Sequence, residues 1–192
     1  MISLLNKLQL KIYCNKIKSV SYKFYNRLLR SPIKDIFESK TIDIHSKGKF
    51  PSNVLSNFHE SSFILDGVQI KSMEGFLQSL KTSDINLQNK ICQLTGKYAK
   101  QAGEDLATSF DHKNIYWQGK LIDRYSNDYQ NLLKRAYNAK FEQDPLFREA
   151  LAKTIGKTLI HSIGKSAKEE TILTEKEFIN MLDFLRKNNI KK

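Results

Sequence analysis

Apolar positions recur at helical spacing in the stretch SMEGFLQSLK, which covers residues 72–81. At about 3.6 residues per turn, one arc of this segment is apolar. That arc comprises Met73, Phe76, Leu77 and Leu80. A polar stripe of Glu74, Gln78 and Lys81 borders it, and the opposite face holds only Gly75 and Ser79. Small side chains permit close approach of another backbone. The pattern therefore predicts a helix whose polar stripe is either a solvated face or a site.

Two short apolar runs precede this helix, FIL at 63–65 and VQI at 68–70, and they flank Asp66-Gly67. Asp and Gly tolerate the positive φ of a tight two-residue turn, so the segment predicts a β-hairpin. The hairpin leads directly to Ser72, whose hydroxyl suits a helix N-cap.

Side chains that suit a helix N-cap or first turn precede the later helical patterns. They are Asp84 before 85–95, Ser126 before 127–143, Asp144 with Pro145 before 146–154, and Thr174 with Glu177 before 178–187. Gly96 is expected to end the first of these helices, and residues 97–106 form a further short helical pattern. The coarse prediction is a mainly α fold of the α+β class, with a small β-hairpin before the first core helix.

The length of 192 residues and the hydrophobic content of 40% suffice for one sizeable core. We therefore predict one domain over residues 42–192, preceded by a basic arm and connector over residues 1–41. The formal net charge is +12, and residues 1–34 contain eight Lys or Arg and no Asp or Glu. Such an arm is a docked solvated segment, a basic helix that touches nucleic acid or an anionic membrane, or a transit peptide. No apolar run approaches the roughly 18 residues of a membrane-spanning helix.

Several kinds of site are disfavoured by spacing. Cys14 and Cys92 are the only cysteines and stand outside any CxxC or Cys/His cluster, which argues against zinc and disulfides and favours a reducing, cytoplasmic setting. GKT at 156–158 and GKS at 164–166 lack the earlier glycine of a phosphate-binding loop. The histidines lack ligand-like spacing, although His161 is placed to line a cleft. Trp117, the only tryptophan, is either a core anchor or a base-stacking platform.

The order of four segments is more specific than any of them alone. LSNF at 55–58, the Asp-Gly hairpin, SMEGFLQSLK and AYNAKFEQDPLFREAL follow one another between residues 42 and 163. In this order the chain resembles the YbiA-like family, also called NADAR for its association with NAD and ADP-ribose. The resemblance implies the YbiA-like multihelical fold.

The resemblance also implies an N-glycosidase, which hydrolyses the bond between ribose and a base. Family substrates are phosphoribosyl-aminopyrimidine intermediates of riboflavin synthesis or ADP-ribosylated guanine. The essential glutamate of the family falls on Glu74. Its substrate-binding positions fall on Ser56, Asn57, Phe58, Gln78 and Lys81, and its active-site tryptophan on Tyr125. Trp117 is a further candidate for contact with the base. No metal or cofactor is implied.

The chain departs from the family in two further places. The histidine common after the family glutamate is Gly75 here, and the glycine-rich loop after the last family helices is replaced by HSIGKSAKEETILTEKEF. Because that loop is expected to touch substrate, its replacement bears on the choice of substrate more than on the reaction.

The residues agree with such chemistry. Cleavage of an N-glycoside develops positive charge at the anomeric carbon, which a fixed carboxylate at Glu74 stabilises, or the carboxylate activates the attacking water. The expected partner is a phosphorylated ribosyl-base, free or on ADP-ribosylated nucleic acid. Two alternatives stay open: a non-catalytic module that binds ADP-ribose or a nucleotide, and a nucleic-acid-associated protein that acts through the basic arm.

Overall fold

The computed structural model describes residues 40–106 and 112–190. The basic arm predicted over residues 1–34 lies outside these ranges, and the proposed start of the domain at residue 42 stays a prediction. In chain order the elements are β1 (Thr41–Asp43), α3 (Ser52–Leu55), β2 (Phe63–Leu65), β3 (Val68–Ile70), α4 (Met73–Ser79), α5 (Ile85–Cys92), α6 (Gly96–Asp105), β4 (Asn114–Trp117), β5 (Lys120–Asp123), α7 (Asn127–Gln143), α8 (Pro145–Ala152), β6 (Thr158–Ile160), the 3-10 helix η1 (Lys168–Glu170) and α9 (Glu175–Asn189). The predicted mainly α fold of the α+β class is confirmed.

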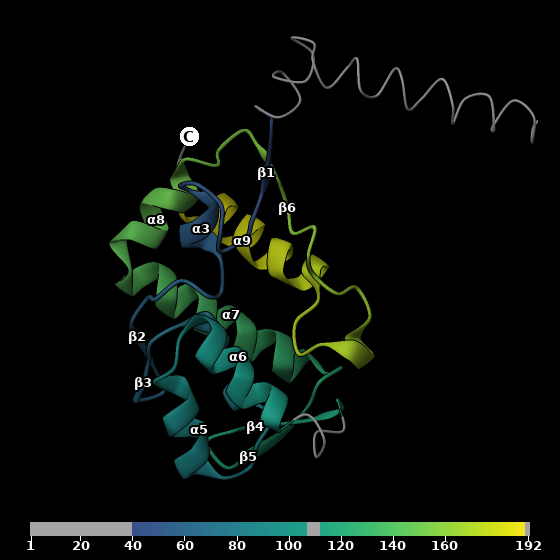
Figure 1. Cartoon of the computed structure of the whole chain (residues 1–192). Coiled ribbons are helices and arrows are strands. Elements are labelled where there is room, and N and C mark those ends of the chain that lie inside the picture. Colours follow the sequence, from purple (N-terminus) through teal and green to yellow (C-terminus); the bar gives the residue numbers. More distant parts are fainter. Residues whose placement is uncertain (1–39, 107–111, 191–192) are drawn as a thin grey trace, which may run out of the picture. The chain divides into compact units, whose positions relative to one another are not determined.

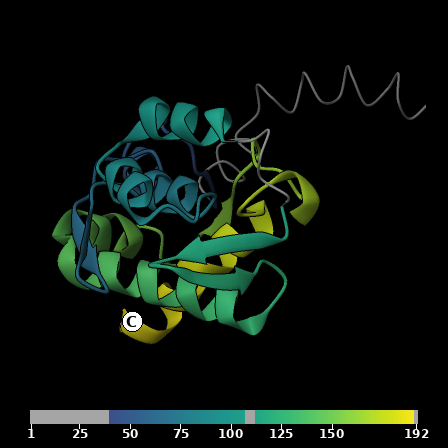
Figure 2. The same ribbon diagram turned by 90° about the horizontal axis from the view of Figure 1, so that it is seen from below.

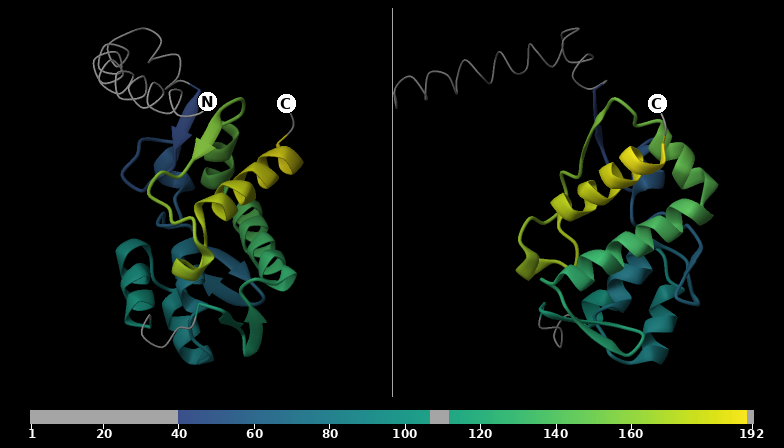
Figure 3. Two further views of the ribbon diagram at one scale, coloured as in Figure 1. Left: turned by 90° about the vertical axis from the view of Figure 1, so that its right-hand side faces the viewer. Right: turned by 180° about the vertical axis from the view of Figure 1, so that it is seen from behind.

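Helix α7 runs through the middle of the domain (Figure 1). Helices α5 and α6 and the β4–β5 hairpin lie on one side of it, while α3, α8 and α9 lie on the other (Figure 1). Helix α9 packs along α7, as both views of Figure 3 show. The side chains that α7 buries recur at helical spacing as predicted: Tyr129, Leu132, Leu133, Ala136 and Tyr137. They join the two sides into one hydrophobic core.

Three two-stranded sheets flank the helices within the described residues. The predicted hairpin is confirmed: β2 and β3 pair antiparallel, and Asp66 and Gly67 both have positive φ, at 51° and 80°. A second hairpin, β4–β5, which contacts α7 (Figure 2), was not predicted. Its turn is Gln118-Gly119, also with positive φ at both residues. Glutamine is an uncommon first residue for such a turn, so the sequence signal was weak.

Local signals located most helix starts. Ser72, Asp84, Ser126 and Asp144 each cap the predicted helix through their side chains. The capping box of Thr174 and Glu177 also forms. One boundary was wrong: α5 ends at Cys92, and Gly96 instead begins α6, with φ at +50°.

Helix α4 is buried on all sides, because every residue from Met73 to Ser79 is buried. On the face predicted to be small, the end of α5 and the residues just after it approach closely: a Cβ at Gly75 would lie 3.0 Å from the carbonyl oxygen of Ile91 and 2.7 Å from that of Leu94. On the apolar face, Phe76 meets the edge of Trp117 with ring centroids 5.2 Å apart. The helix is therefore central in the fold, and its polar stripe is not a solvated surface.

No helix in the described ranges is both long and apolar enough to cross a membrane.

Gly75→Ala is expected to lower the free energy of unfolding by about 1–3 kcal/mol, because the new methyl group meets backbone carbonyls that cannot move independently. Urea denaturation of the two proteins measures the difference. Asn131→Ala, on the exposed face of α7, is the control for helix propensity and should change stability by under about 0.5 kcal/mol. A Gly75→Ala protein as stable as the wild type would contradict the close approach of α5.

Candidate functional site

A cavity of about 510 Å³ opens beside the polar stripe of α4. Glu74, Gln78 and Lys81 line it together with Ser56, Asn57 and Phe58. The structure thus brings together six of the eight residues that the sequence singled out. Helix α6 and the segment between β6 and α9 contribute further walls.

The loop Ser56–Phe58 is held against both α4 and α7. It follows α3 directly, and Ser56 adopts an extended conformation that ends the helix. The carbonyl of Asn57 accepts a hydrogen bond from the Glu74 N–H at 2.9 Å. Its side-chain Oδ1 accepts one from the Tyr137 hydroxyl at 2.8 Å. Asn57 therefore fixes the start of α4 relative to the central helix.

Glu74 places a carboxylate in the cavity wall with only 8% of the residue exposed. Gln78, one turn later, donates a hydrogen bond from Nε2 to Glu74 Oε1 at 2.8 Å. Gln78 in turn fits only because residue 103 lacks a side chain: a Cβ there would lie 1.7 Å from Gln78 Oε1. The carboxylate is thus held by an amide that is itself confined between two helices.

Burial raises the pKa of the Glu74 carboxyl above its ordinary value of 4.5. The hydrogen bond from Gln78 and the charges of Lys100 and Lys81 act in the opposite direction. A carboxylate that is poorly solvated but still held by a donor suits a group that must accept a proton or face a developing cation.

Lys81 lies where α4 ends and donates from Nζ to the carbonyl of Gly103 at 3.1 Å. Burial lowers its pKa below 10.5, and the neighbouring carboxylates of Glu74 and Glu104 partly compensate. Helix α6 adds Lys100 and Glu104, which form an exposed ion pair at 3.9 Å on the cavity rim. These two residues were not predicted, although their spacing of four on a helix next to Gly103 is a local signal for a charged rim.

The segment after β6 forms a further wall of the cavity. It supplies Gly164, Lys165 and the run Glu170–Thr174, while His161 lines the wall beside it. His161 was placed in a cleft by the sequence, and it does line this one: its Nδ1 lies 2.6 Å from the carbonyl oxygen of Ile44, and its ring packs edge-on against Phe178. This is the stretch that the family resemblance predicts in place of a glycine-rich loop, and part of it lines the cavity.

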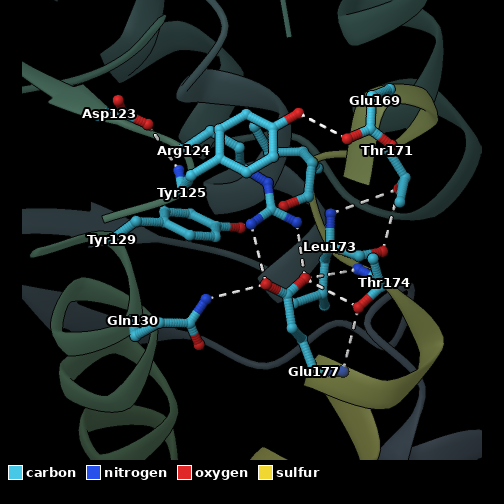
Figure 4. Close-up of polar contacts among 11 residues, drawn as sticks. Asp123, Arg124, Tyr125, Tyr129, Gln130, Glu169, Thr171, Leu173, Thr174 and Glu177 are labelled. Carbon is cyan, nitrogen blue, oxygen red and sulfur yellow. Dashed lines mark hydrogen bonds and ion pairs between the residues drawn. The ribbon is translucent and has the colours of Figure 1, made fainter. Parts of the chain in front are cut away.

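A buried ion pair anchors this wall (Figure 4). Arg124, fully buried after β5, donates to both carboxylate oxygens of Glu177 at 2.8 and 2.6 Å. Glu177 also accepts from the backbone N–H and the hydroxyl of Thr174, each at 2.9 Å. The Tyr129 hydroxyl donates to the carbonyl of Ile172. The wall is therefore attached to the core of the domain through charged and aromatic groups.

Two predicted substrate-binding residues lie outside the cavity lining. Trp117 is 4% exposed in the core, and its Nε1 donates to Asp66 Oδ2 at 2.7 Å. Trp117 therefore packs in the core, which was one of the two roles predicted for it from the sequence. Tyr125 is 46% exposed, and its hydroxyl donates to Glu169 at 2.9 Å (Figure 4). Neither ring lines the cavity, so neither is placed to stack on a base bound there.

Sequence reasoning missed Arg124 and Glu177 as partners, because 53 residues separate them. The capping box identified Glu177 as a local helix signal only. In residues 40–106 and 112–190, no three His, Cys, Asp or Glu side chains group as a metal site requires.

Comparisons with known proteins place these features in a wider context. The sequence profile of a family described as "Bacteriophage protein GP30.3" matches residues 49–187. A relative from Enterobacteria phage T4, named "Uncharacterized 17.1 kDa protein in Gp30-rIII intergenic region", is 40% identical over 146 residues. The alignment covers 76% of this chain and 96% of that protein.

The NMR structure of the E. coli protein YbiA is similar in fold, with a TM-score of 0.53 and 18% sequence identity. The superposition covers 77% of this chain and 83% of that one. The YbiA-like fold expected from the sequence is confirmed.

Glu177→Gln is expected to lower the free energy of unfolding by about 3–5 kcal/mol near pH 7, because it leaves Arg124 charged and buried without its partner. Burial acts to raise the pKa of Glu177, but the hydrogen bonds and charge of Arg124, with the hydrogen bonds from Thr174 and Gln130, lower it from 4.5 to about 2. The contribution of the pair is therefore complete above pH 4.5 and is lost as the pH falls from there toward 2. Urea denaturation at pH 7 and pH 3 should show a smaller difference between the proteins at the lower pH.

Asp183→Asn is the matched control, since Asp183 is an acid on the same helix in a more exposed pair with Arg186. It should cost under about 1 kcal/mol at either pH. Equal losses for the two variants would show that Arg124 and Glu177 do not form a buried pair.

Proposed function

Because this chain belongs to the bacteriophage protein GP30.3 family and has a YbiA-like fold, we propose that it is an N-glycosidase. It hydrolyses the bond between a phosphate-bearing ribose, phosphoribosyl or ADP-ribosyl, and a nitrogenous base. The supporting observation is Glu74, a carboxylate buried in the wall of a cavity and held there by the amide of Gln78.

Glu74 acts on the anomeric carbon and on the attacking water. As the bond from the anomeric carbon to the base nitrogen breaks, positive charge develops on the sugar, and the nearby carboxylate stabilises it. Water forms the new bond to the anomeric carbon and gives its proton to Glu74. The proton then passes to the departing base, so Glu74 returns to its ionised form.

The other lining residues bind and orient the substrate. Asn57 and Gln78 present amide groups suited to ribose hydroxyls or to a base edge, and Phe58 offers an aromatic ring near them. Lys81 supplies a positive charge at the end of the same helix, which suits a phosphate group and favours the ionised form of Glu74.

Direct assay distinguishes this proposal from a binding module. The full chain is incubated with ADP-ribosylated guanine and with a phosphoribosyl-aminopyrimidine, and released base is separated by chromatography. Release of base from either substrate supports the proposal. Binding of ADP-ribose without release of base from any ribosylated compound would favour the non-catalytic module instead.

Glu74→Gln is expected to lower kcat by roughly a hundred- to ten-thousandfold with little change in KM. The substitution keeps size and hydrogen-bonding capacity but removes the charge that the cationic transition state requires. Because burial disfavours the ionised carboxylate, the variant should be no less stable than the wild type near neutral pH. Steady-state kinetics and urea denaturation of both proteins test these expectations.

Glu104→Gln is the control for loss of a carboxylate, since Glu104 borders the same cavity but its side chain is 55% exposed. Its kcat should stay within about threefold of the wild type. A fully active Glu74→Gln protein would end the catalytic assignment.

The pH dependence of kcat/KM should report the raised pKa of Glu74. The ionised form is the active one, so activity rises as the pH rises through this pKa and falls on the acid side. Since burial raises the pKa of Glu74 above 4.5, kcat/KM should fall to half of its plateau value at a pH above 4.5. The residual activity of Glu74→Gln should lack this acid limb. An acid limb below pH 4.5 in the wild type would contradict the assignment.

A further inference from the structure

Three lysines from three different elements border the cavity. Lys81 follows α4, Lys100 lies on α6, and Lys165 lies on the wall segment between β6 and α9. Lys165 belongs to the GKS stretch, whose spacing excludes a phosphate-binding loop of the familiar kind. The fold nevertheless brings this Gly-Lys pair to the cavity that contains Glu74.

The three charges are close enough to act on one another. Burial is the main cause of the lowered pKa of Lys81, and the charges of Lys100 and Lys165 lower it further. Glu74 and Glu104 are the carboxylates that oppose this effect. The cavity lining thus contains these three lysines together with the carboxylates of Glu74 and Glu104.

Each of these charged groups also has contacts within the domain. Glu74 accepts a hydrogen bond from Gln78, and Glu104 meets Lys100 only at 3.9 Å, with both side chains exposed. Lys165 contacts the backbone carbonyl of Glu170 at 3.4 Å, which is a weak hydrogen bond in an exposed position. Glu170 also lines the cavity, so the lining contains a third carboxylate.

We infer that Lys165 completes, with Lys81 and Lys100, an anion subsite that binds the phosphate or diphosphate of the substrate. This inference rests on the proposed function, because it names the part of the same cavity that recognises the charged end of the substrate. Glu74 then lies at the reacting end, and the lysines lie at the phosphate end.

The backbone of Lys165 is held in place before any ligand arrives. Its carbonyl accepts a hydrogen bond from the N–H of Glu175 at 2.9 Å, at the first residue of α9. The neighbouring Gly164 lies so close to His161 and Glu175 that a Cβ there would come within 2.7 Å of both side chains. A cation on a prepositioned wall loses less conformational entropy on binding than one on a free loop.

The test is calorimetric titration of the full chain with pyrophosphate, ADP-ribose and uncharged ribose. Lys165→Met should weaken the affinity for pyrophosphate and ADP-ribose by about tenfold, the effect of losing one charge-assisted hydrogen bond, and should leave ribose binding unchanged. Lys168→Met is the matched control. Lys168 lies three residues further along the same segment, over the ring of Tyr125 and outside the cavity lining, so its loss should leave all three affinities unchanged.

The outcomes separate this inference from the proposed function. Selective loss of pyrophosphate affinity in Lys165→Met supports the subsite even if the chain releases no base from any substrate. If Lys165→Met turns over substrate with an unchanged KM, the proposed enzymatic function stands and the anion subsite is wrong. Equal effects of Lys165→Met and Lys168→Met, or no binding of either phosphate compound by the wild type, would also overturn it.

Discussion

Helix α4 can carry a buried carboxylate only because the rest of the domain is packed around all of its faces. Gly75 lets the backbone of α5 approach one face, and Gly103 makes room for Gln78 on another. Phe76 fills the core beside Trp117. With the other sides of the helix covered in this way, the polar stripe is left facing the cavity, and the Glu74 carboxylate lies in its wall.

Burying polar groups costs stability unless they are paired, and the domain contains both paired and unpaired buried polar groups. The Arg124–Glu177 pair is bidentate, and Gln130 and Thr174 donate further hydrogen bonds to Glu177, although Arg124 Nε is buried without a hydrogen bond within the described residues. Lys140 is the opposite case. It is fully buried, its pKa is lowered to about 8 by burial, and within the described residues its ammonium meets only the ring of Phe147. The cavity wall is thus held by a largely paired network, whereas Lys140 and, within the site itself, Gln78 Oε1 are buried without a hydrogen bond among the described residues.

Features set by neighbours in sequence were predictable, and features set by distant segments were not. Ser72 caps α4 through a residue three positions away, and the Asp66-Gly67 turn requires only its own φ angles, so both could be read from the chain. The family resemblance supplied the grouping of Ser56–Phe58 with α4. By contrast, the pairing of β1 with β6 and the partner of Arg124 depend on how segments far apart in sequence meet. The same reason explains why Trp117 was a candidate for contact with the base: composition cannot tell which side of a core an aromatic ring faces.

The residues that line the cavity come from two parts of the chain that are far apart in sequence and are synthesised at different times. During synthesis the segments that carry Glu74, Gln78 and Lys81 emerge first, whereas the wall from Gly164 to Thr174 and its anchor Glu177 emerge about ninety residues later. A nascent chain that ends after α8 already contains the carboxylate but has one side of its pocket missing and Arg124 without its partner. Formation of the complete cavity therefore requires the segment up to α9, and a product truncated before it retains Glu74 without this wall.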